Sequence, residues 1–431
     1  MASPKIPIKA SVKSLEPSAT LVINEKSKTL LADGKKVYKL GFGQSPFPIP
    51  KQVVEALQYA AHKKDYLPVR GLQLLREEVA KYYQKKLQIH CEAADVMIGP
   101  GSKELILILQ LACKADLILP SPSWVSYEPQ ANLAQNKVIW VSTGEKENWL
   151  ITPEKLEEAC LNNLSVPKII ILNYPSNPVG VTYNQKQLKA LAVVAKKHQL
   201  LIVADEIYGE LTFSEQHFSI AQFYPEGTII SGGLSKWCGA GGWRLGTFTF
   251  PAEMRYLLDT MATIASESFS AVSAPVQFAA ITAYKGSIEI DNYLFKSNAI
   301  LKAIAEKAHS LLAEAGVSMP LPQGGFYLFP NFKAFKTNLA KKGVHTSTDF
   351  CELLLKETGV ALLPGVAFGR PDKELTCRLS YVDFNGEQAL KKYDGGIIND
   401  LFLLEQCPLV IEGIVEIVNW LKKEDSIGDS Y

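Results

Sequence analysis

The sequence predicts an α/β protein with a mainly parallel central sheet covered by helices on both faces, followed by a smaller α+β domain. Short β-rich runs alternate with helical segments between about residues 95 and 250. The apolar runs 169–172 and 200–203 show no polar alternation, as is typical of strands covered on both faces. Helices of about a dozen residues separate these strands, which favours βαβ units and a parallel sheet.

The first part of the chain is expected to be mostly helical. Pro and Gly interrupt the helical spacing near residue 70, so the pattern there predicts two helices rather than one. The expected elements are a helix over 21–33 closed by Gly34, a short strand over 37–41, a loop at 43–46, and helical segments over 52–87 with a break at 66–71.

The middle of the chain carries the sheet. We expect strands over 95–98, 117–119, 137–141, 168–172, 200–203, 228–231 and 246–250, and helices over 102–114, 123–134, 153–163 and 184–198.

The remainder is predicted to form a smaller α+β domain and a helical tail. Its elements are a helix over 284–316, strands within 325–330, 360–362 and 377–381, and a helix over 347–358. The predicted division is an N-terminal arm with part of the small domain (1–45), a large domain (46–300) and a small C-terminal domain (301–431).

Composition excludes several classes of protein. The 431 residues include 45 Lys and Arg against 44 Asp and Glu, so a dedicated nucleic-acid binder, which needs a basic excess, is not expected. The seven cysteines form no C-x-x-C motif, which argues against a zinc cluster or a disulfide framework, and no metal site is predicted. No secretory signal or membrane-spanning run is evident, so we expect a cytoplasmic protein.

Chemically useful side chains follow three of the predicted strands. Asn177 comes after the strand at 168–172, Asp205 and Tyr208 after that at 200–203, and Lys236 after that at 228–231. Open α/β sheets build their sites at the carboxyl ends of strands. The pattern therefore predicts one crevice that holds an amide, a carboxylate, a phenol and an amine.

This set of groups suits pyridoxal phosphate. A lysine kept partly neutral by burial can attack a carbonyl and form a Schiff base, which is the role predicted for Lys236. A carboxylate such as Asp205 holds the pyridine nitrogen of that cofactor protonated, and Tyr208 and Asn177 suit its phenolic oxygen.

The phosphate of the cofactor would need hydrogen-bond donors and positive charge. Ser102 opens a predicted helix after Gly99-Pro100-Gly101, and a helix N-terminus favours anions. Ser235 and Arg244 complete the predicted phosphate site.

Four motifs in order resemble those of the class I and II aminotransferases of pyridoxal phosphate fold type I. They are Asn177-Pro178-x-Gly180, Asp205-x-x-Tyr208, Ser235-Lys236, and Arg244 eight residues after the lysine. The resemblance runs from about residue 13 to 384. It implies that Lys236 binds the cofactor and later moves the substrate proton, with Asp205 and Tyr208 as the other catalytic residues.

The same resemblance assigns further residues. It implies that Trp124 stacks on the cofactor ring, that Arg378 and Gly43 bind the substrate α-carboxylate, and that Trp124 and Asn177 face the substrate as well as the cofactor. Tyr66 corresponds to a phosphate contact that crosses from a partner subunit, which implies a homodimer with shared active sites.

A finer likeness, to the bacterial (Ib) aspartate aminotransferases, concerns the substrate. There, residues at the positions of Thr20 and Lys103 contact the distal carboxylate, and Lys103 also lies near the cofactor. Two stretches depart from the subgroup: Gln44-Ser45-Pro46 replaces a glutamate-proline-aspartate turn, and 385–410 resembles an insertion.

The resulting hypothesis is a ping-pong aminotransferase that moves an amino group from an L-amino acid, with aspartate as the best guess, to 2-oxoglutarate. The alternatives within the fold are an aromatic, kynurenine-like or prephenate aminotransferase and a C–S lyase. A non-catalytic regulator that binds the cofactor as a sensor is the alternative from another class. Such proteins usually carry a DNA-binding module, and neither the N-terminal arm of roughly 40 residues nor the near-neutral charge predicts one.

Overall fold

A seven-stranded sheet forms the centre of the protein. The computed structural model describes residues 6–13, 15, 19–162, 165–214 and 216–426. The strand order is β1-β7-β6-β5-β4-β2-β3. The strands are β1 (Val96–Gly99), β2 (Asp116–Ser121), β3 (Val138–Ser142), β4 (Lys168–Asn173), β5 (Leu201–Asp205), β6 (Thr228–Gly233) and β7 (Gly246–Thr249).

Only β7 runs against the others. β2 pairs in parallel with β3 and β4, and β5 pairs in parallel with β4 and β6, whereas β7 is antiparallel to both β6 and β1. The predicted mainly parallel α/β sheet is thus confirmed. The register brings Asn173 and Asp205, which end their strands, side by side with Ser231 of β6.

Helices cover both faces of this sheet because successive strand residues point to opposite sides. Ile169 and Ile171 of β4 pack with the helices α5 (Ser102–Ala112), α6 (Tyr127–Ala134) and α9 (Arg255–Ser266). Their neighbours Ile170 and Leu172 pack with α7 (Pro153–Leu161) and α8 (Gln185–Lys197) on the other face. This two-sided burial explains why the strand sequences are continuously apolar.

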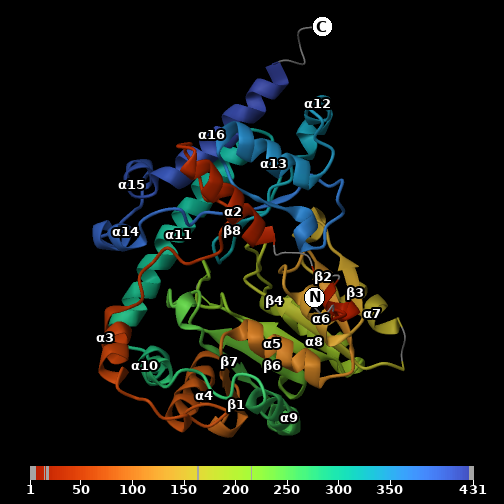
Figure 1. The fold of residues 1–431 in the computed structure, drawn as a ribbon, viewed down its shortest axis with the longest axis vertical. Coiled ribbons are helices and arrows are strands. Elements are labelled where there is room, and N and C mark those ends of the chain that lie inside the picture. The colour runs from red at the N-terminus through yellow and green to blue at the C-terminus, as the bar shows by residue number, and fades with distance from the viewer. Residues whose placement is uncertain (1–5, 14, 16–18, 163–164, 215, 427–431) are drawn as a thin grey trace, which may run out of the picture.

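A second, three-stranded sheet lies farther along the chain. It has the order β8-β10-β9, with β8 (Tyr327–Leu328), β9 (Leu363–Pro364) and β10 (Cys377–Ser380), and both pairings are antiparallel. The helix α11 (Ile288–Glu314) extends from the side of the large sheet to the C-terminal helices (Figure 1). One apolar core includes residues of β1, α11, β8 and β10, so it joins the two sheets. Where one domain ends and the next begins stays a prediction.

The other helices are short, apart from the last. They are α1 (Ala10–Lys13), α2 (Ala19–Ala32), α3 (Lys51–Ala60), α4 (Gln73–Leu87), α10 (Ala274–Lys285), α12 (Lys336–Lys341), α13 (Ser347–Thr358), α14 (Gly386–Lys392), α15 (Asp400–Gln406) and α16 (Pro408–Ser426). Among the helices that the structure describes, none is long and apolar enough to span a membrane.

Three expectations differ from the structure. The strand expected over 37–41 is reduced to a single bridge between Tyr38 and Val360, and the strand expected over 360–362 begins only at Leu363. The helix expected from residue 123 begins at Tyr127, because the backbone N–H of Ser123 donates to the carbonyl of Phe368 instead of entering a helix. Helices α9 and α10 had no sequence-based assignment at all.

Candidate active site

A cavity of about 480 Å³ opens at the carboxyl ends of the parallel strands. Asp205 ends β5, Asn173 ends β4, and Lys236 lies three residues beyond β6. The residues that line the cavity are Gly43, Gln44, Ser102, Lys103, Trp124, Tyr127, Asn173, Asn177, Asp205, Ile207, Tyr208, Ser235, Lys236, Gly241, Gly242 and Arg244. Ten of the residues singled out from sequence therefore face one space.

Asp205 is the buried acid of the cavity, with only 3% of its surface exposed. Burial raises the pKa of its carboxyl to about 6, although hydrogen bonds hold the pKa below what burial alone would give. Tyr127 Oη donates to Oδ2 and Ser231 Oγ donates to Oδ1, at 3.3 Å for the serine. At neutral pH the carboxylate is therefore mostly charged, fixed in direction, and able to bind a cation.

Lys236 is the amine of the cavity. The residue as a whole is half-buried, but its Nζ lies away from solvent and donates to the carbonyl of Gly43 at 2.7 Å. Desolvation, with the nearby charge of Arg378 as a smaller cause, lowers the pKa of Lys236 to about 8, while Asp205 acts in the opposite direction. A useful fraction of this side chain is thus a neutral nucleophile near physiological pH.

Tyr208 and Asn177 stand beside these two groups. Burial raises the pKa of the Tyr208 phenol well above its usual range, so it stays protonated and can donate a hydrogen bond. The Asn177 backbone N–H donates to Asn173 Oδ1 at 2.7 Å, and the Asn177 side-chain oxygen accepts from Arg378 Nη1 at 3.1 Å. The bond from Arg378 therefore holds the Asn177 side chain in place.

The N-terminus of α5 and Arg244 form an anion site at one end of the cavity. The first N–H groups of a helix have no partner within the helix, and no side chain caps this one. Gly101 precedes Ser102 with φ = 94°, and a Cβ there would lie 2.3 Å from Arg244 Nη2. Likewise a Cβ on Gly246 would lie 2.2 Å from the Ser102 nitrogen. The glycines therefore allow the cation and the helix end to approach each other closely.

Arg378 comes from the small sheet, on β10, and reaches the same region. Its Nη2 donates to the carbonyl of Gly41 at 2.7 Å, while its buried Nε has no hydrogen-bond partner. The guanidinium lies 4.7 Å from the ring centre of Tyr327. A buried guanidinium with spare donors suits a carboxylate ligand, which it can bind through two hydrogen bonds.

Lys103 and Trp124 form the wall near the entrance. Lys103 Nζ lies 5.3 Å from the ring centre of Trp124, and partial desolvation together with the charge of Arg244 lowers the pKa of Lys103. The Trp124 ring packs edge-on against Tyr127, with ring centres 5.2 Å apart.

Among the predicted residues whose side chains the structure describes, Tyr66 and Arg378 do not line this cavity. Tyr66 is 95% exposed. Thr20 lies in the first turn of α2, but its side chain is outside the part of the chain that the structure describes.

Sequence reasoning missed Tyr127, Asn173, Ser231 and Tyr327. Asn173 ends β4 and Ser231 lies near the end of β6, both beside Asp205, so their position was a usable signal. Tyr127 and Tyr327 come from a helix start and from the distant small sheet, and nothing in their local sequence indicates the cavity.

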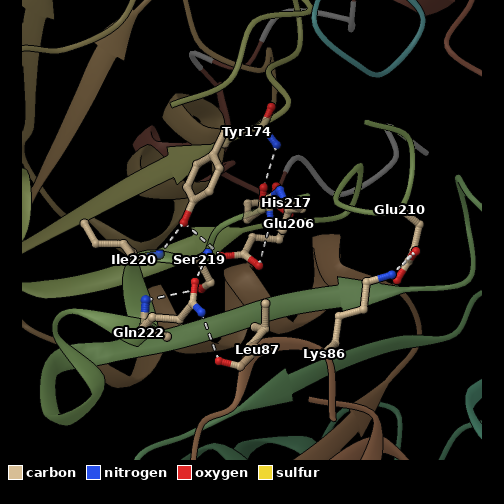
Figure 2. A network of polar contacts seen from close by, with 12 residues as sticks. Lys86, Leu87, Tyr174, Glu206, Glu210, His217, Ser219, Ile220 and Gln222 are labelled. Atoms are coloured by element: carbon tan, nitrogen blue, oxygen red, sulfur yellow. Dashed lines mark hydrogen bonds and ion pairs between the residues drawn. The ribbon is translucent and has the colours of Figure 1, made fainter. Parts of the chain in front are cut away.

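A buried polar network lies next to the ends of β4 and β5. Figure 2 shows Glu206 between Tyr174 and His217: Tyr174 Oη donates to Glu206 Oε1 at 2.9 Å, and His217 Nε2 lies 3.0 Å from Oε2. Tyr174 Oη in turn accepts from the backbone N–H of Ile220 at 2.9 Å. Because Glu206 directly follows Asp205, and Tyr174 follows Asn173, the network fixes the backbone on which the site residues stand.

The chain is similar to several known proteins over most of its length. The chain is 38% identical over 381 residues to an aspartate aminotransferase of Geobacillus stearothermophilus, covering 86% of this chain and 93% of that protein. It is 34% identical over 384 residues to an asparagine–oxo-acid transaminase of Streptococcus mutans, with 86% and 93% covered. It is 32% identical over 368 residues to an aspartate/prephenate aminotransferase of Cereibacter sphaeroides, with 82% and 90% covered.

Solved structures match in fold. An aspartate aminotransferase from Thermus thermophilus with maleate superposes with a TM-score of 0.83 at 24% identity, covering 96% of this chain and all of that one. The family model for aminotransferase class I and II matches residues 35–385. This match spans more than half of the chain and includes the whole cavity, and the chain therefore belongs to the class I and II aminotransferases.

Proposed function

We propose that this aminotransferase uses pyridoxal phosphate to move the amino group of L-aspartate to 2-oxoglutarate in two half-reactions. The observation that carries the proposal is the pairing of Lys236 and Asp205 in one cavity. The environment makes the lysine more readily neutral and leaves the carboxyl largely charged at pH 7. These are the two states that a cofactor aldehyde and a protonated pyridine nitrogen require.

The residues of the cavity fit this cofactor. Ser102, Ser235 and Arg244, with the N-terminus of α5, would hold its phosphate, and Asp205 would pair with its ring nitrogen. Asn177 and Tyr208 would donate to its phenolic oxygen, and Trp124 would cover the ring. When bound, pyridoxal phosphate supplies an electron sink for the charge left on the substrate Cα.

The protein's own part is to bind the amino acid and to move one proton. Arg378 would bind the α-carboxylate together with Asn177 and the backbone at Gly43, which orients the Cα–H bond. Lys236 Nζ, once free as an amine, would take the proton from Cα and deliver it to the former aldehyde carbon of the cofactor in the same half-reaction. In the second half-reaction it would move a proton in the opposite direction, onto the Cα of the new amino acid.

The preference for aspartate rests on positive charge at the entrance. Lys103 lines the cavity, and desolvation together with the nearby charge of Arg244 lowers its pKa. A second carboxylate on the substrate would offset the repulsion between these two cations. We include Thr20 in the same contact, by likeness to the subgroup, and the names of the relatives support a dicarboxylic substrate.

We further propose a homodimer with shared active sites. Tyr66 is a large aromatic residue with almost its whole surface exposed. By the same likeness, it would reach the phosphate site of a second subunit. Sedimentation of the holoenzyme, compared with that of a Tyr66→Ala variant, tests the assembly, and cofactor affinity tests the contact.

The decisive experiment is a steady-state assay with a panel of amino donors. Purified protein with added pyridoxal phosphate should show visible absorbance and parallel double-reciprocal lines for aspartate and 2-oxoglutarate. The panel should include asparagine, phenylalanine and prephenate as donor or acceptor. A tenfold higher kcat/KM for an aromatic substrate would replace aspartate by the aromatic or prephenate alternative. Release of pyruvate or ammonia without an oxo acid would instead indicate a lyase.

A further inference from the structure

Tyr327 lies where the small sheet meets the cavity. It begins β8, is almost completely buried, and its Oη is 2.8 Å from Oη of Tyr208. Through this contact a polar atom of the small sheet reaches the phenol that the proposed function places on the cofactor.

The direction of this hydrogen bond follows from the number of protons. Each phenol has one hydroxyl proton, and the proton of Tyr208 is already used if Tyr208 donates to the cofactor oxygen. Tyr327 must then be the donor to the Tyr208 oxygen. Hydrogen bonds in such a chain strengthen one another, so the Tyr327 proton makes Tyr208 a better donor.

Two contacts keep the Tyr327 hydroxyl in this position. The ring lies beneath the guanidinium of Arg378, 4.7 Å from ring centre to Cζ. A Cβ added to Gly43 would lie 2.3 Å from Tyr327 Oη, so the loop backbone closes the other side. Tyr327 therefore touches the phenol, the loop and the arginine of the site while remaining outside the cavity lining.

We propose that Tyr327 is a positioning residue for this reaction: its hydroxyl orients and strengthens Tyr208 as a hydrogen-bond donor to the cofactor's phenolic oxygen. The proposal rests on the proposed use of pyridoxal phosphate. The charged and titratable groups that face the two phenols are Arg378, Lys236, Asp205 and Tyr381.

The test is the pH titration of the visible spectrum of the holoenzyme, which needs no turnover. A donor to the phenolic oxygen favours the deprotonated chromophore, so a weaker donor raises the midpoint pH. Tyr327→Phe keeps the ring beneath Arg378 and should raise the midpoint by about 0.1 to 0.7 unit, because a neighbouring hydrogen bond strengthens a bond to a charged acceptor by roughly 10–30%. Binding of succinate, read from the same spectrum, should change less than twofold.

Two comparisons make the result specific. Tyr381→Phe removes another buried tyrosine hydroxyl, one without a hydrogen-bond partner, and should leave the midpoint unchanged. In a Tyr208→Phe background the Tyr327→Phe shift should disappear, because the donor that it acts on is gone.

Each outcome decides one claim. An unchanged midpoint in Tyr327→Phe, or an equal shift with and without Tyr208, overturns the role of Tyr327. If the unaltered protein shows no visible absorbance with pyridoxal phosphate, the proposed function itself has failed, and the role of Tyr327 fails with it.

Discussion

Replacing Tyr127 by phenylalanine should weaken cofactor binding in a way that depends on pH. Tyr127 Oη donates to the buried Asp205 carboxylate, which has a pKa of about 6. A hydrogen bond to a charged group is worth roughly 1.5–3 kcal/mol, and 1.36 kcal/mol equals one pKa unit. Losing the bond should therefore raise the pKa of Asp205 to roughly 7–8. Phenylalanine keeps the ring that packs against Trp124, so the cavity wall stays intact.

The magnitude follows from the ionised fraction of Asp205. At pH 6 this fraction falls from roughly one half to between about a tenth and a hundredth, which predicts about five- to fiftyfold weaker binding of pyridoxal phosphate. At pH 9 the carboxylate is charged in both proteins and the affinities should converge. Spectrophotometric titration of each cofactor-free protein with pyridoxal phosphate measures its dissociation constant. The ratio of the two constants cancels the effect of ionisable groups that titrate equally in both proteins.

Two results bear directly on this reasoning. Ser231→Ala removes the longer, 3.3 Å bond to the same carboxylate and should give a smaller change of the same sign. A Tyr127→Phe defect of equal size at pH 6 and pH 9 would refute the reasoning, since a general loss of packing does not follow the charge of Asp205.

Three other predictions concern the amine and the entrance of the cavity. Lys236→Ala should abolish both turnover and the visible absorbance of the holoenzyme; retention of either would contradict its role. The rate at which added pyridoxal phosphate becomes attached to Lys236, measured by borohydride trapping, should rise with a midpoint near pH 8 as the amine loses its proton, and a flat profile from pH 7 to 9 would argue against the lowered pKa. Lys103→Ala should reduce kcat/KM for aspartate about tenfold more than for phenylalanine, whereas equal losses would remove Lys103 from substrate selection.

The large sheet could be predicted from sequence because burial on both faces leaves a clear pattern. The run at 169–172 is continuously apolar since Ile169 and Ile170 face different helix layers, and both layers are closed. The small sheet left a weaker signal. Its strands β8 and β9 have two residues each, too few for a period to be recognised, and their placement depends on pairing with β10.

The same distinction applies to the site. Asp205 and Lys236 stand at or just beyond ends of strands that the sheet brings together, so their meeting follows from topology. Tyr127 reaches Asp205 across 78 residues, and Tyr327 reaches Tyr208 across 119. Such contacts depend on how whole elements pack. The local sequence around a buried tyrosine does not distinguish one that contacts a site residue from one that only fills the core.

The positions of the charged residues around the cavity suggest that different residues serve the reaction and the selection of the substrate. The side chains of Lys236, Arg244, Lys103 and Arg378 outweigh the single carboxylate of Asp205, and each of the other three cations lowers the pKa of Lys236. Anionic ligands offset this repulsion, which favours a phosphate at one end and carboxylates at the other. Under the proposed function, the groups at the strand ends would hold the reacting atoms, and the sheet fixes their positions. Selection among amino acids would then fall to the entrance, where Lys103 and Gln44 are exposed and a substitution would change the ligand without disturbing the sheet. A chain of this fold can therefore change the amino acid that it accepts as substrate while keeping the same reaction.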